Sequence, residues 1–459
     1  MRPTRLLFLI YQYVSAITGL LGFPYFYWHL KSRGQGESFW PRLGLKLPSD
    51  PRPPGSPQFW LHGVSVGEIL AAVPLAQELQ TLLPHCSLIV TTGTETGQAL
   101  ARKHFTPMGA CVCYFPLDLP WAVQRYLNYL RPQVFVALES EIWPNFLYCA
   151  HQLGVRLALV NARVSDKSFH RFLQYKRYLS DIFDLFDLVA AGSPGDFHRF
   201  QELGFPAERL HLTGNLKSDR LFQAQDSERI AEFRALVQGP PANLEFPVFL
   251  AASTHPGEEE MMVAAYEQLR LPYPALRFIL APRHPERVPQ LVSLLERRGL
   301  RSHLWSRLKS GLELRSQPVV LVDTIGDLLN LYGVADVVFV GGSLVPHGGQ
   351  NLLEPASLGR APLYGPYVSN FRWAQEILEE AGAGLLVQDV ASLTAAALNL
   401  LDHPEVRLDL GSRAQAALAR HRGAARRQAE LIAGLVGGEG QGQNPLSAPP
   451  NPQELRRDR

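Results

Sequence analysis

The sequence predicts an α/β protein with two doubly wound domains in tandem and a cleft between them. Short apolar runs alternate with helical stretches along most of the 459 residues, which is typical of parallel sheets covered by helices on both faces. The alternation lapses near residues 215–247, where Pro240, Pro241 and Pro247 fall, and then starts again. Because ligands of such sheets bind beyond the carboxyl ends of the strands, we expect the functional site in the cleft.

Charge and cysteine content exclude some classes of protein. The net charge is +2 and the pI is about 8.3, so the chain lacks the strongly basic domain of a nucleic-acid-binding protein and no nucleic-acid partner is expected. No second Cys or His pair stands at zinc spacing, and we expect reduced thiols and no metal site. The cysteines concerned are Cys86, Cys111, Cys113 and Cys149.

The N-terminal segment differs from the rest of the chain. Leu6–Leu30 contains no charged residue apart from histidine, is about as long as a bilayer is thick, and carries tyrosines and a tryptophan. Residues 1–30 are therefore predicted to be a membrane anchor, in preference to a buried helix or a cleaved signal peptide. A half-inserted, monotopic anchor stays open because of its polar residues and proline, which are Gln12, Ser15, Thr18 and Pro24.

The first domain is predicted to span residues 58–225, after a Pro- and Gly-rich linker at residues 31–57. A helix is expected from about Ser65 to Leu83. The expected strands are Gln58–His62, Ser87–Thr91, Val134–Leu138, Arg156–Val160 and Leu188–Ala191.

The second domain is predicted to span residues 247–435, after an interdomain linker at residues 226–246. Residues 436–459 are rich in Gly, Pro, Gln and Asn and are predicted to be a disordered tail. The expected strands are Val248–Ala252, Arg277–Ala281, Val319–Val322, Val337–Val340 and Gly384–Val387.

A glycine-rich run follows one of these strands and ends in a predicted helix near Asn351. It contains Gly341-Gly342-Ser343 and then Gly348-Gly349. A strand, a glycine loop and a helix in succession are typical of a site where free backbone N–H groups point at an anion. Glu354, in the first helical turn, is placed to hold a ribose hydroxyl. The spacing of Asn351 and Glu354 is also that of a capping box, so a plain helix start is the competing interpretation.

Carboxylates follow two strands of the first domain. Ser65 and Glu68 have capping-box spacing, but Glu68 at the cleft floor would also suit a general base, with its pKa raised by desolvation. Glu139 and Glu141 follow a buried strand and would point opposite ways if that strand continued. One would then face the cleft while the other forms an ion pair behind it; the alternative is that both are solvated.

Further polar groups follow strands near the domain junction and in the second domain. Lys217 is placed to reach a phosphate, although single lysines are usually surface charges. Arg283 suits a bidentate phosphate contact, and Thr324 to Asp327 resembles a helix cap facing a nucleotide. His255 and His284 each lack a partner at metal-ligand spacing. Since these groups share one side of each sheet, they favour a cleft enzyme that takes an activated, anionic donor.

Eight motifs occur in an order that resembles the 3-deoxy-D-manno-octulosonic acid (Kdo) transferases of lipopolysaccharide synthesis. The resemblance covers about Gln58 to Gly384. The motifs are SVGE, ESEIWPN, NARVS, TGNLK, ASTHPGEEE, PRHPERV, DTIGDL and the run FVGGSLV to GGQNLLEPA. The resemblance implies an inverting GT-B glycosyltransferase without cofactor or metal. It further implies CMP-Kdo as donor, a lipid A precursor such as lipid IVA as acceptor, and attachment to the cytoplasmic face of the cell inner membrane.

The resemblance also implies roles for individual residues. Glu68 corresponds to the catalytic base, and Glu139 and Lys217 to groups that stabilise the transition state. The sequence departs from the family where Ile325-Gly326-Asp327 stands for the usual Met-Gly-Glu and Gln350 for the usual His, so the contacts to base and ribose are expected to differ in detail. The implied CMP contacts are Pro282, Arg283, Ile325, Gly326, Asp327, Asn351, Leu352, Leu353 and Glu354.

Two alternatives remain at this point. One is another GT-B enzyme, which uses a UDP- or GDP-sugar or is an epimerase. The other is a non-catalytic, membrane-attached binder of nucleotide sugars, against which the presence of Glu68 argues.

Overall fold

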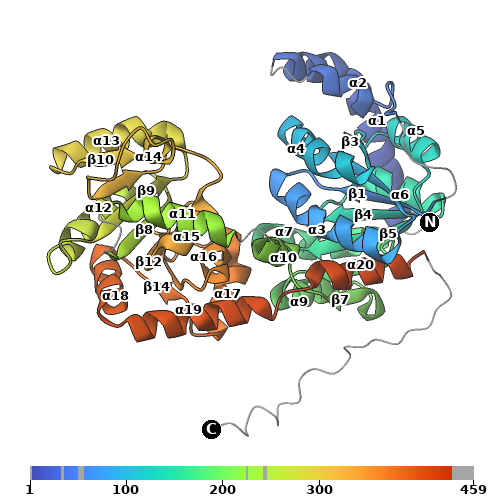
Figure 1. Ribbon diagram of the computed structural model, residues 1–459. Helices are drawn as coiled ribbons and strands as arrows, with labels where there is room; N and C mark the ends of the chain where they lie inside the picture. Colours follow the sequence, from blue (N-terminus) through green and yellow to red (C-terminus); the bar gives the residue numbers. More distant parts are fainter. Residues whose placement is uncertain (1–2, 33–35, 50–55, 224–225, 241–244, 437–459) are drawn as a thin grey trace, which may run out of the picture.

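The computed structural model describes residues 3–32, 36–49, 56–223, 226–240 and 245–436. Figure 1 shows two α/β bodies side by side, each with a sheet between layers of helices, and a C-terminal helix that returns to the first body. The predicted tail at residues 436–459 lies outside the described residues except for Val436.

Within the described residues, the first sheet has seven parallel strands in the order β3-β2-β1-β4-β5-β6-β7. Every strand predicted for this domain is present. The edge strands β3 and β7 went unpredicted because one is interrupted by cysteines and the other is very short. The bounds are β1 Gln58–His62, β2 Ser87–Thr92, β3 Cys111–Tyr114, β4 Val134–Leu138, β5 Arg156–Ala162, β6 Leu188–Ala191 and β7 Leu210–Leu212.

The second sheet, likewise counted over the described part of the chain, has seven parallel strands in the order β10-β11-β9-β8-β12-β13-β14. The predicted parallel α/β architecture is therefore confirmed in both halves. The bounds are β8 Val248–Thr254, β9 Arg277–Pro282, β10 Ser302–Leu304, β11 Val319–Leu321, β12 Val337–Val340, β13 Pro362–Tyr364 and β14 Leu385–Leu386.

The helices cover both faces of the two sheets. Those up to the domain junction are α1 Pro3–Ser32, α2 Phe39–Arg42, α3 Val66–Leu82, α4 Glu95–Phe105, α5 Pro120–Leu130, α6 Pro144–Gln152, α7 Asp166–Gln174, α8 Lys176–Phe183, α9 Pro194–Leu203 and α10 Leu216–Gln223. The remainder are α11 Ser227–Gln238, α12 Glu258–Leu269, α13 Val288–Arg297, α14 Trp305–Lys309, α15 Leu328–Val334, α16 Leu353–Ser357, α17 Arg372–Glu380, α18 Val390–Asp402, α19 Pro404–Ala419 and α20 Ala424–Gly434.

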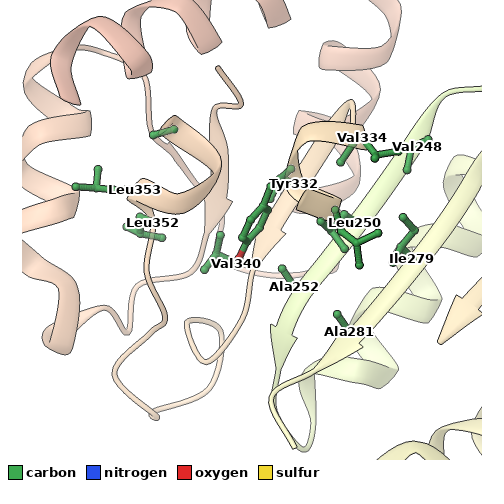
Figure 2. Close-up of a cluster of buried hydrophobic side chains, with 14 of the residues drawn as sticks. Val248, Leu250, Ala252, Ile279, Ala281, Tyr332, Val334, Val340, Leu352 and Leu353 are labelled. Carbon is green, nitrogen blue, oxygen red and sulfur yellow. The ribbon is translucent and has the colours of Figure 1, made fainter. Parts of the chain in front are cut away.

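The central strands are apolar on both faces because helices bury both. In the second domain, Tyr332 of α15 lies against strand residues Leu250, Ala252 and Val340, as Figure 2 shows. Its side chain is 1% exposed. This packing explains why the strand sequences are continuous apolar runs without polar alternation.

Two helices depart from the predicted domain bounds. Residues 226–246, predicted to be a linker, contain α11, whose Phe233 and Val237 are buried in the second core against α15. Helix α20 was predicted to be part of the second domain, but it packs on α3 and inserts Ala425 and Ile432 into the first core. Both helices bury apolar residues, and contacts with segments far away in the chain determine which core they join.

Helix α1 packs against the first domain. The Phe8 ring lies 4.2 Å from that of Tyr148, and the Tyr11 hydroxyl donates to Asp118 Oδ2 at 3.0 Å. Among the helices formed by the described residues, α1 included, none combines the length and the apolarity needed to cross a bilayer. In the predicted linker at residues 31–57, Phe39 is fully buried beside α1.

Candidate functional site

Part of the predicted site lies at the points where strand order reverses. Glu68 follows β1, and Glu139 and Glu141 follow its neighbour β4. In the second sheet, His255 follows β8, and the glycine run follows the neighbouring β12. Parallel sheets bind ligands at such reversal points, beyond the carboxyl ends of the strands.

Glu68 lies in the first turn of α3 and is 8% exposed. Its Oε1 accepts from Ser65 Oγ at 2.7 Å, and its Oε2 accepts from Val64 N at 2.7 Å. Ser65 also caps the helix, since its Oγ accepts from Glu68 N at 3.2 Å. Burial, supported by the charge of Glu139, raises the pKa of Glu68 above its ordinary value, although these hydrogen bonds oppose the rise. The capping contacts therefore hold a partly desolvated carboxylate in a fixed orientation.

Glu139 and Lys217 form an ion pair, with 2.6 Å between Nζ and Oε1. Glu139 has a left-handed backbone with φ +58°, which turns the chain sharply at the end of β4. Lys217 is held at the start of α10, where the preceding Leu216 N donates to Asn161 Oδ1 at 3.0 Å. The two residues are far apart in sequence, and this ion pair brings them together at the carboxyl end of β4.

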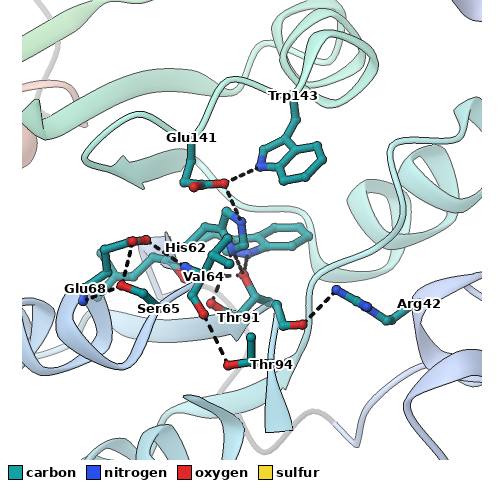
Figure 3. A network of polar contacts seen from close by, with 12 residues as sticks. Arg42, His62, Val64, Ser65, Glu68, Thr91, Thr94, Glu141 and Trp143 are labelled. Atoms are coloured by element: carbon teal, nitrogen blue, oxygen red, sulfur yellow. Dashed lines mark hydrogen bonds and ion pairs between the residues drawn. The ribbon is translucent and has the colours of Figure 1, made fainter. Parts of the chain in front are cut away.

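Glu141 lies in a small polar network, which Figure 3 shows. Its Oε2 accepts from Trp143 Nε1 at 2.9 Å and lies 3.8 Å from His62 Nε2. Burial, together with the charges of Glu68 and Glu139, raises the pKa of Glu141 to about 7. The side chains of Glu139 and Glu141 are 16% and 18% exposed, so the alternative that both are solvated is wrong.

His62 is a component of this network that sequence reasoning missed. Burial lowers the pKa of His62 to about 3, so the ring is neutral. Its Nδ1 lies 3.2 Å from the carbonyl oxygen of Thr91 and 3.1 Å from the Thr91 hydroxyl oxygen. Its Nε2 is buried and makes no hydrogen bond to a described residue, and it faces Glu141. The only signal in the sequence was a polar residue at the end of an apolar strand.

The first part of the glycine run in the second domain uses its backbone N–H groups within the protein. The N–H groups of Gly342, Ser343 and Leu344 donate to the carboxylate of Glu258 at 2.6–2.9 Å. The His255 N–H donates to the same carboxylate at 2.9 Å, and Glu258 is fully buried. At Gly342–Leu344 the anion is therefore the protein's own carboxylate, and these three N–H groups are not available to a ligand.

The helix start after the glycine run has the contacts of a cap. Asn351 Oδ1 accepts from Leu353 N at 3.1 Å, and Asn351 Nδ2 donates to Glu354 Oε1 at 3.3 Å. Gly349 N donates to Gly342 O at 2.8 Å, so this N–H group is also occupied. Leu352 and Leu353 have side chains buried in the core. Only their backbone groups remain for a ligand, and the Leu353 N–H is already bonded to Asn351.

Asp327 is likewise engaged within the protein. Its carboxylate accepts from Lys309 Nζ at 2.7 Å, Thr324 Oγ1 at 2.6 Å and Trp305 Nε1 at 3.1 Å. Burial alone would raise the pKa of Asp327, but these hydrogen bonds outweigh it and leave the pKa lowered. The preceding Ile325 is 89% exposed. Ile325 and Gly326 are thus the accessible part of this loop.

Arg283 and Pro282 lie at the end of β9, next to β8. The Arg283 N–H donates to Thr254 O at 2.9 Å, and the side chain is exposed. Across the described ranges, no group of three His, Cys, Asp or Glu residues has the arrangement of a metal site. All four cysteines lie in these ranges and are free thiols, as predicted.

The two-domain fold is shared with solved structures of nucleotide-sugar enzymes. A glycosyltransferase from Rickettsia africae superposes with a TM-score of 0.58 at 11% identity and covers 84% of this chain and 100% of its own. A UDP-GlcNAc 2-epimerase from Neisseria meningitidis superposes with a TM-score of 0.57 at 12% identity and covers 82% and 99%. These likenesses define the class as the GT-B-like fold, which transferases and epimerases both have.

Sequence relatives decide between these enzymes. The family model for 3-deoxy-D-manno-octulosonic-acid transferase (kdotransferase) matches residues 37–220. A 3-deoxy-D-manno-octulosonic acid transferase from Haemophilus influenzae is 35% identical over 387 residues, which are 84% of this chain and 88% of the relative. One from Bordetella pertussis is 33% identical over 93% of this chain and 99% of its own length. The chain therefore belongs to the Kdo transferase family, and it is a glycosyltransferase that transfers Kdo.

Proposed function

We propose that the enzyme transfers Kdo from CMP-Kdo to a lipid A precursor, such as lipid IVA, in lipopolysaccharide synthesis. The observation that carries this proposal is Glu68, a partly desolvated carboxylate at the reversal point of the first sheet. The Glu139–Lys217 ion pair lies at the end of the neighbouring strand. The names of the relatives support the choice of sugar, since they are Kdo transferases.

In the proposed reaction Glu68 is the general base. It takes the proton of the acceptor hydroxyl while that oxygen attacks the anomeric carbon of Kdo, and the bond to CMP breaks on the opposite face. The configuration at the anomeric carbon is then inverted. Each oxygen of Glu68 accepts one hydrogen bond within the protein, which leaves room for the hydroxyl proton. A raised pKa brings its basicity closer to that task.

Cations stabilise the phosphate of the departing CMP in this scheme. Lys217 and Arg283 carry the charges, and such preorganised groups are typically worth a few kcal/mol each in the transition state. No metal ion is required. We assign CMP contacts to Pro282, Arg283, Ile325, Gly326, Asp327, Asn351, Leu352, Leu353 and Glu354. Because the side chains of Asp327, Leu352 and Leu353 are buried, these three would contact CMP through their backbone.

Helix α1 is proposed to attach the enzyme to the cytoplasmic face of the inner membrane. Large apolar or aromatic side chains project from it at intervals of three or four residues, and exposed Trp40 and Leu45 follow in the chain. A stripe of this kind suits insertion parallel to the membrane plane, as a monotopic anchor. The side chains of the stripe, which are 51–75% exposed, are Tyr13, Val14, Ile17, Leu21, Tyr25 and Trp28.

The test is incubation of the purified enzyme with CMP-Kdo and lipid IVA, followed by mass spectrometry of the lipid. We expect a product heavier by one or more Kdo units, and the same yield with a metal chelator present. UDP- and GDP-sugars serve as control donors. Transfer from one of these, with none from CMP-Kdo, would overturn the proposal.

A further inference from the structure

A polar cavity of about 380 Å³ opens beside Glu139 in the first domain. It is lined by Arg163 and Ser165 from the segment after β5, and by Ser168 and Arg171 from α7. The wall formed by Glu139 joins this cavity to the ion pair with Lys217. A cavity of this size holds a phosphate or carboxylate group together with part of a sugar ring.

The charged side chains that line the cavity differ in whether they form ion pairs. Glu139 is already paired with Lys217. Arg163 donates to the carbonyl oxygen of Asn370 at 3.3 Å, and the Arg171 guanidinium lies 5.9 Å from the centre of the Phe172 ring. Within the described residues, neither arginine forms an ion pair with a carboxylate. The cavity therefore presents two guanidinium groups that are not tied up in ion pairs, beside the paired carboxylate of Glu139 and near Asp196.

Two neighbouring arginines, unlike Arg163 and Arg171, form ion pairs with a carboxylate. Arg199 and Arg372 both form ion pairs with Asp166, the acidic residue in the first turn of α7. Asp166 is thus engaged by other cations, and Asp196, which lies near Arg163, accepts hydrogen bonds from Val164 N and Ser193 Oγ. The hydroxyl of Ser165 donates to Ser168 Oγ at 3.1 Å, so hydroxyl groups line the space between the two arginines.

We infer that this cavity is an anion-binding subsite, in which Arg163 and Arg171 hold a phosphate or carboxylate group of a substrate during transfer. A guanidinium group matches either anion with two parallel N–H donors. The inference rests on the proposed function, because a lipid A precursor supplies a phosphate monoester and CMP-Kdo supplies a sugar carboxylate. Through Arg163 the subsite also touches Asn370 of the second domain, so an anion bound there would lie at the contact between the domains.

The kinetic test compares Arg171→Gln with Arg177→Gln. Arg177 is exposed on α8 and does not line the cavity, so it is the matched control. We expect Arg171→Gln to raise the KM of one substrate about tenfold with kcat little changed, and Arg177→Gln to leave both KM values within twofold. A thermal melt checks that both variants are folded.

The same assay distinguishes the two substrate groups that could be the bound anion, the acceptor phosphate and the sugar carboxylate. If the KM for lipid IVA rises, and does not rise for an acceptor from which the phosphates have been removed, the subsite holds the acceptor phosphate. If the KM for CMP-Kdo rises while inhibition by CMP is unchanged, it holds the sugar carboxylate. Unchanged KM values for both substrates would overturn the inference.

A binding measurement that needs no transfer keeps the inference independent of the proposed function. Inorganic phosphate is titrated into wild type, Arg177→Gln and the double variant Arg163→Gln/Arg171→Gln, and the melting temperature is followed. We expect phosphate to raise the Tm of the first two proteins more than that of the double variant. An equal rise in all three would overturn the inference, whereas absence of Kdo transfer in the wild type would overturn only the proposed function.

Discussion

The two sheet edges that frame the site use their carboxylates in opposite ways. At the first edge, each oxygen of Glu68 accepts one hydrogen bond within the protein. At the second edge, each oxygen of Glu258 accepts two backbone N–H groups, and the side chain is fully buried. The first carboxylate therefore retains acceptor capacity, and the second has none left. The first edge is therefore suited to proton transfer, and the second to holding a loop in shape.

Pairs of residues with the same spacing in the sequence can therefore have different surroundings in the fold. Ser65 and Glu68, and His255 and Glu258, are each three residues apart, as are Thr324 and Asp327. All three acids follow a strand and stand at or near a helix start. Their functions diverge because the number of donors around each carboxylate differs, and donors from distant segments are not visible in the local sequence.

The largest expected effect is on stability at the second edge. Glu258→Gln replaces one carboxylate oxygen with an amide group that faces N–H donors, which leaves two buried N–H groups without an acceptor. We expect the free energy of unfolding to fall by about 3–5 kcal/mol. Urea unfolding measures this, with the exposed Glu260→Gln as control, for which a change below about 0.5 kcal/mol is expected. Equal stability of the two variants would show that Glu258 does not hold the loop.

The next effect is on turnover at the first edge. Lys217→Ala removes the cation paired with Glu139 and leaves that carboxylate without its partner. We expect kcat to fall about 10²–10³-fold. Thermal unfolding should be affected little, because the Lys217 side chain is 30% exposed. Steady-state rates with saturating CMP-Kdo measure the effect, and normal turnover would remove the assigned role.

The smallest effect is a pH dependence of stability that comes from Glu141. Its pKa is about 7 in the folded protein and 4.5 as the ordinary value, so the folded state favours the protonated form. The stability that this preference contributes is complete below about pH 4.5 and is lost as the pH rises through about 7. Glu141→Gln cannot ionise and escapes this loss.

Thermal or urea unfolding at pH 5 and pH 8.5 tests this prediction. We take the free energy of unfolding of Glu141→Gln minus that of wild type at each pH. This difference should be larger at pH 8.5 than at pH 5, by at most about 3 kcal/mol. If the free energy of unfolding of the variant minus that of wild type were the same at pH 5 and pH 8.5, Glu141 would titrate as an ordinary surface carboxylate.

Much of the fold was predictable because buried parallel strands leave continuous apolar runs, as in Val134–Leu138. Two short strands of the second sheet were not predicted, since β10 and β13 contain only three residues each. Helices α11 and α20 were assigned to the wrong places because the sequence shows an apolar stripe but not the core that receives it. To assign a helix to one of the two domains, its contacts with distant segments must be known.

For the candidate site, the sequence likewise provided candidate residues but not the contacts that they make. The motifs pointed to Glu68, Glu139 and Lys217, and the structure pairs the last two; their catalytic roles stay predictions. The sequence did not reveal that Glu258 would occupy the glycine loop, or that Asp327 would be enclosed by Lys309 and Trp305. In both cases the deciding contacts join segments far apart in the chain.

The central claim is that the carboxylate of Glu68 performs the chemistry while the second domain binds the nucleotide. The most direct measurement is the single-turnover rate of Kdo transfer by Glu68→Gln with CMP-Kdo and lipid IVA in excess of their KM values. We predict a rate lower by about 10²–10⁴-fold, with CMP affinity equal to that of the wild type. A Glu68→Gln enzyme that transfers Kdo at the wild-type rate would contradict the claim.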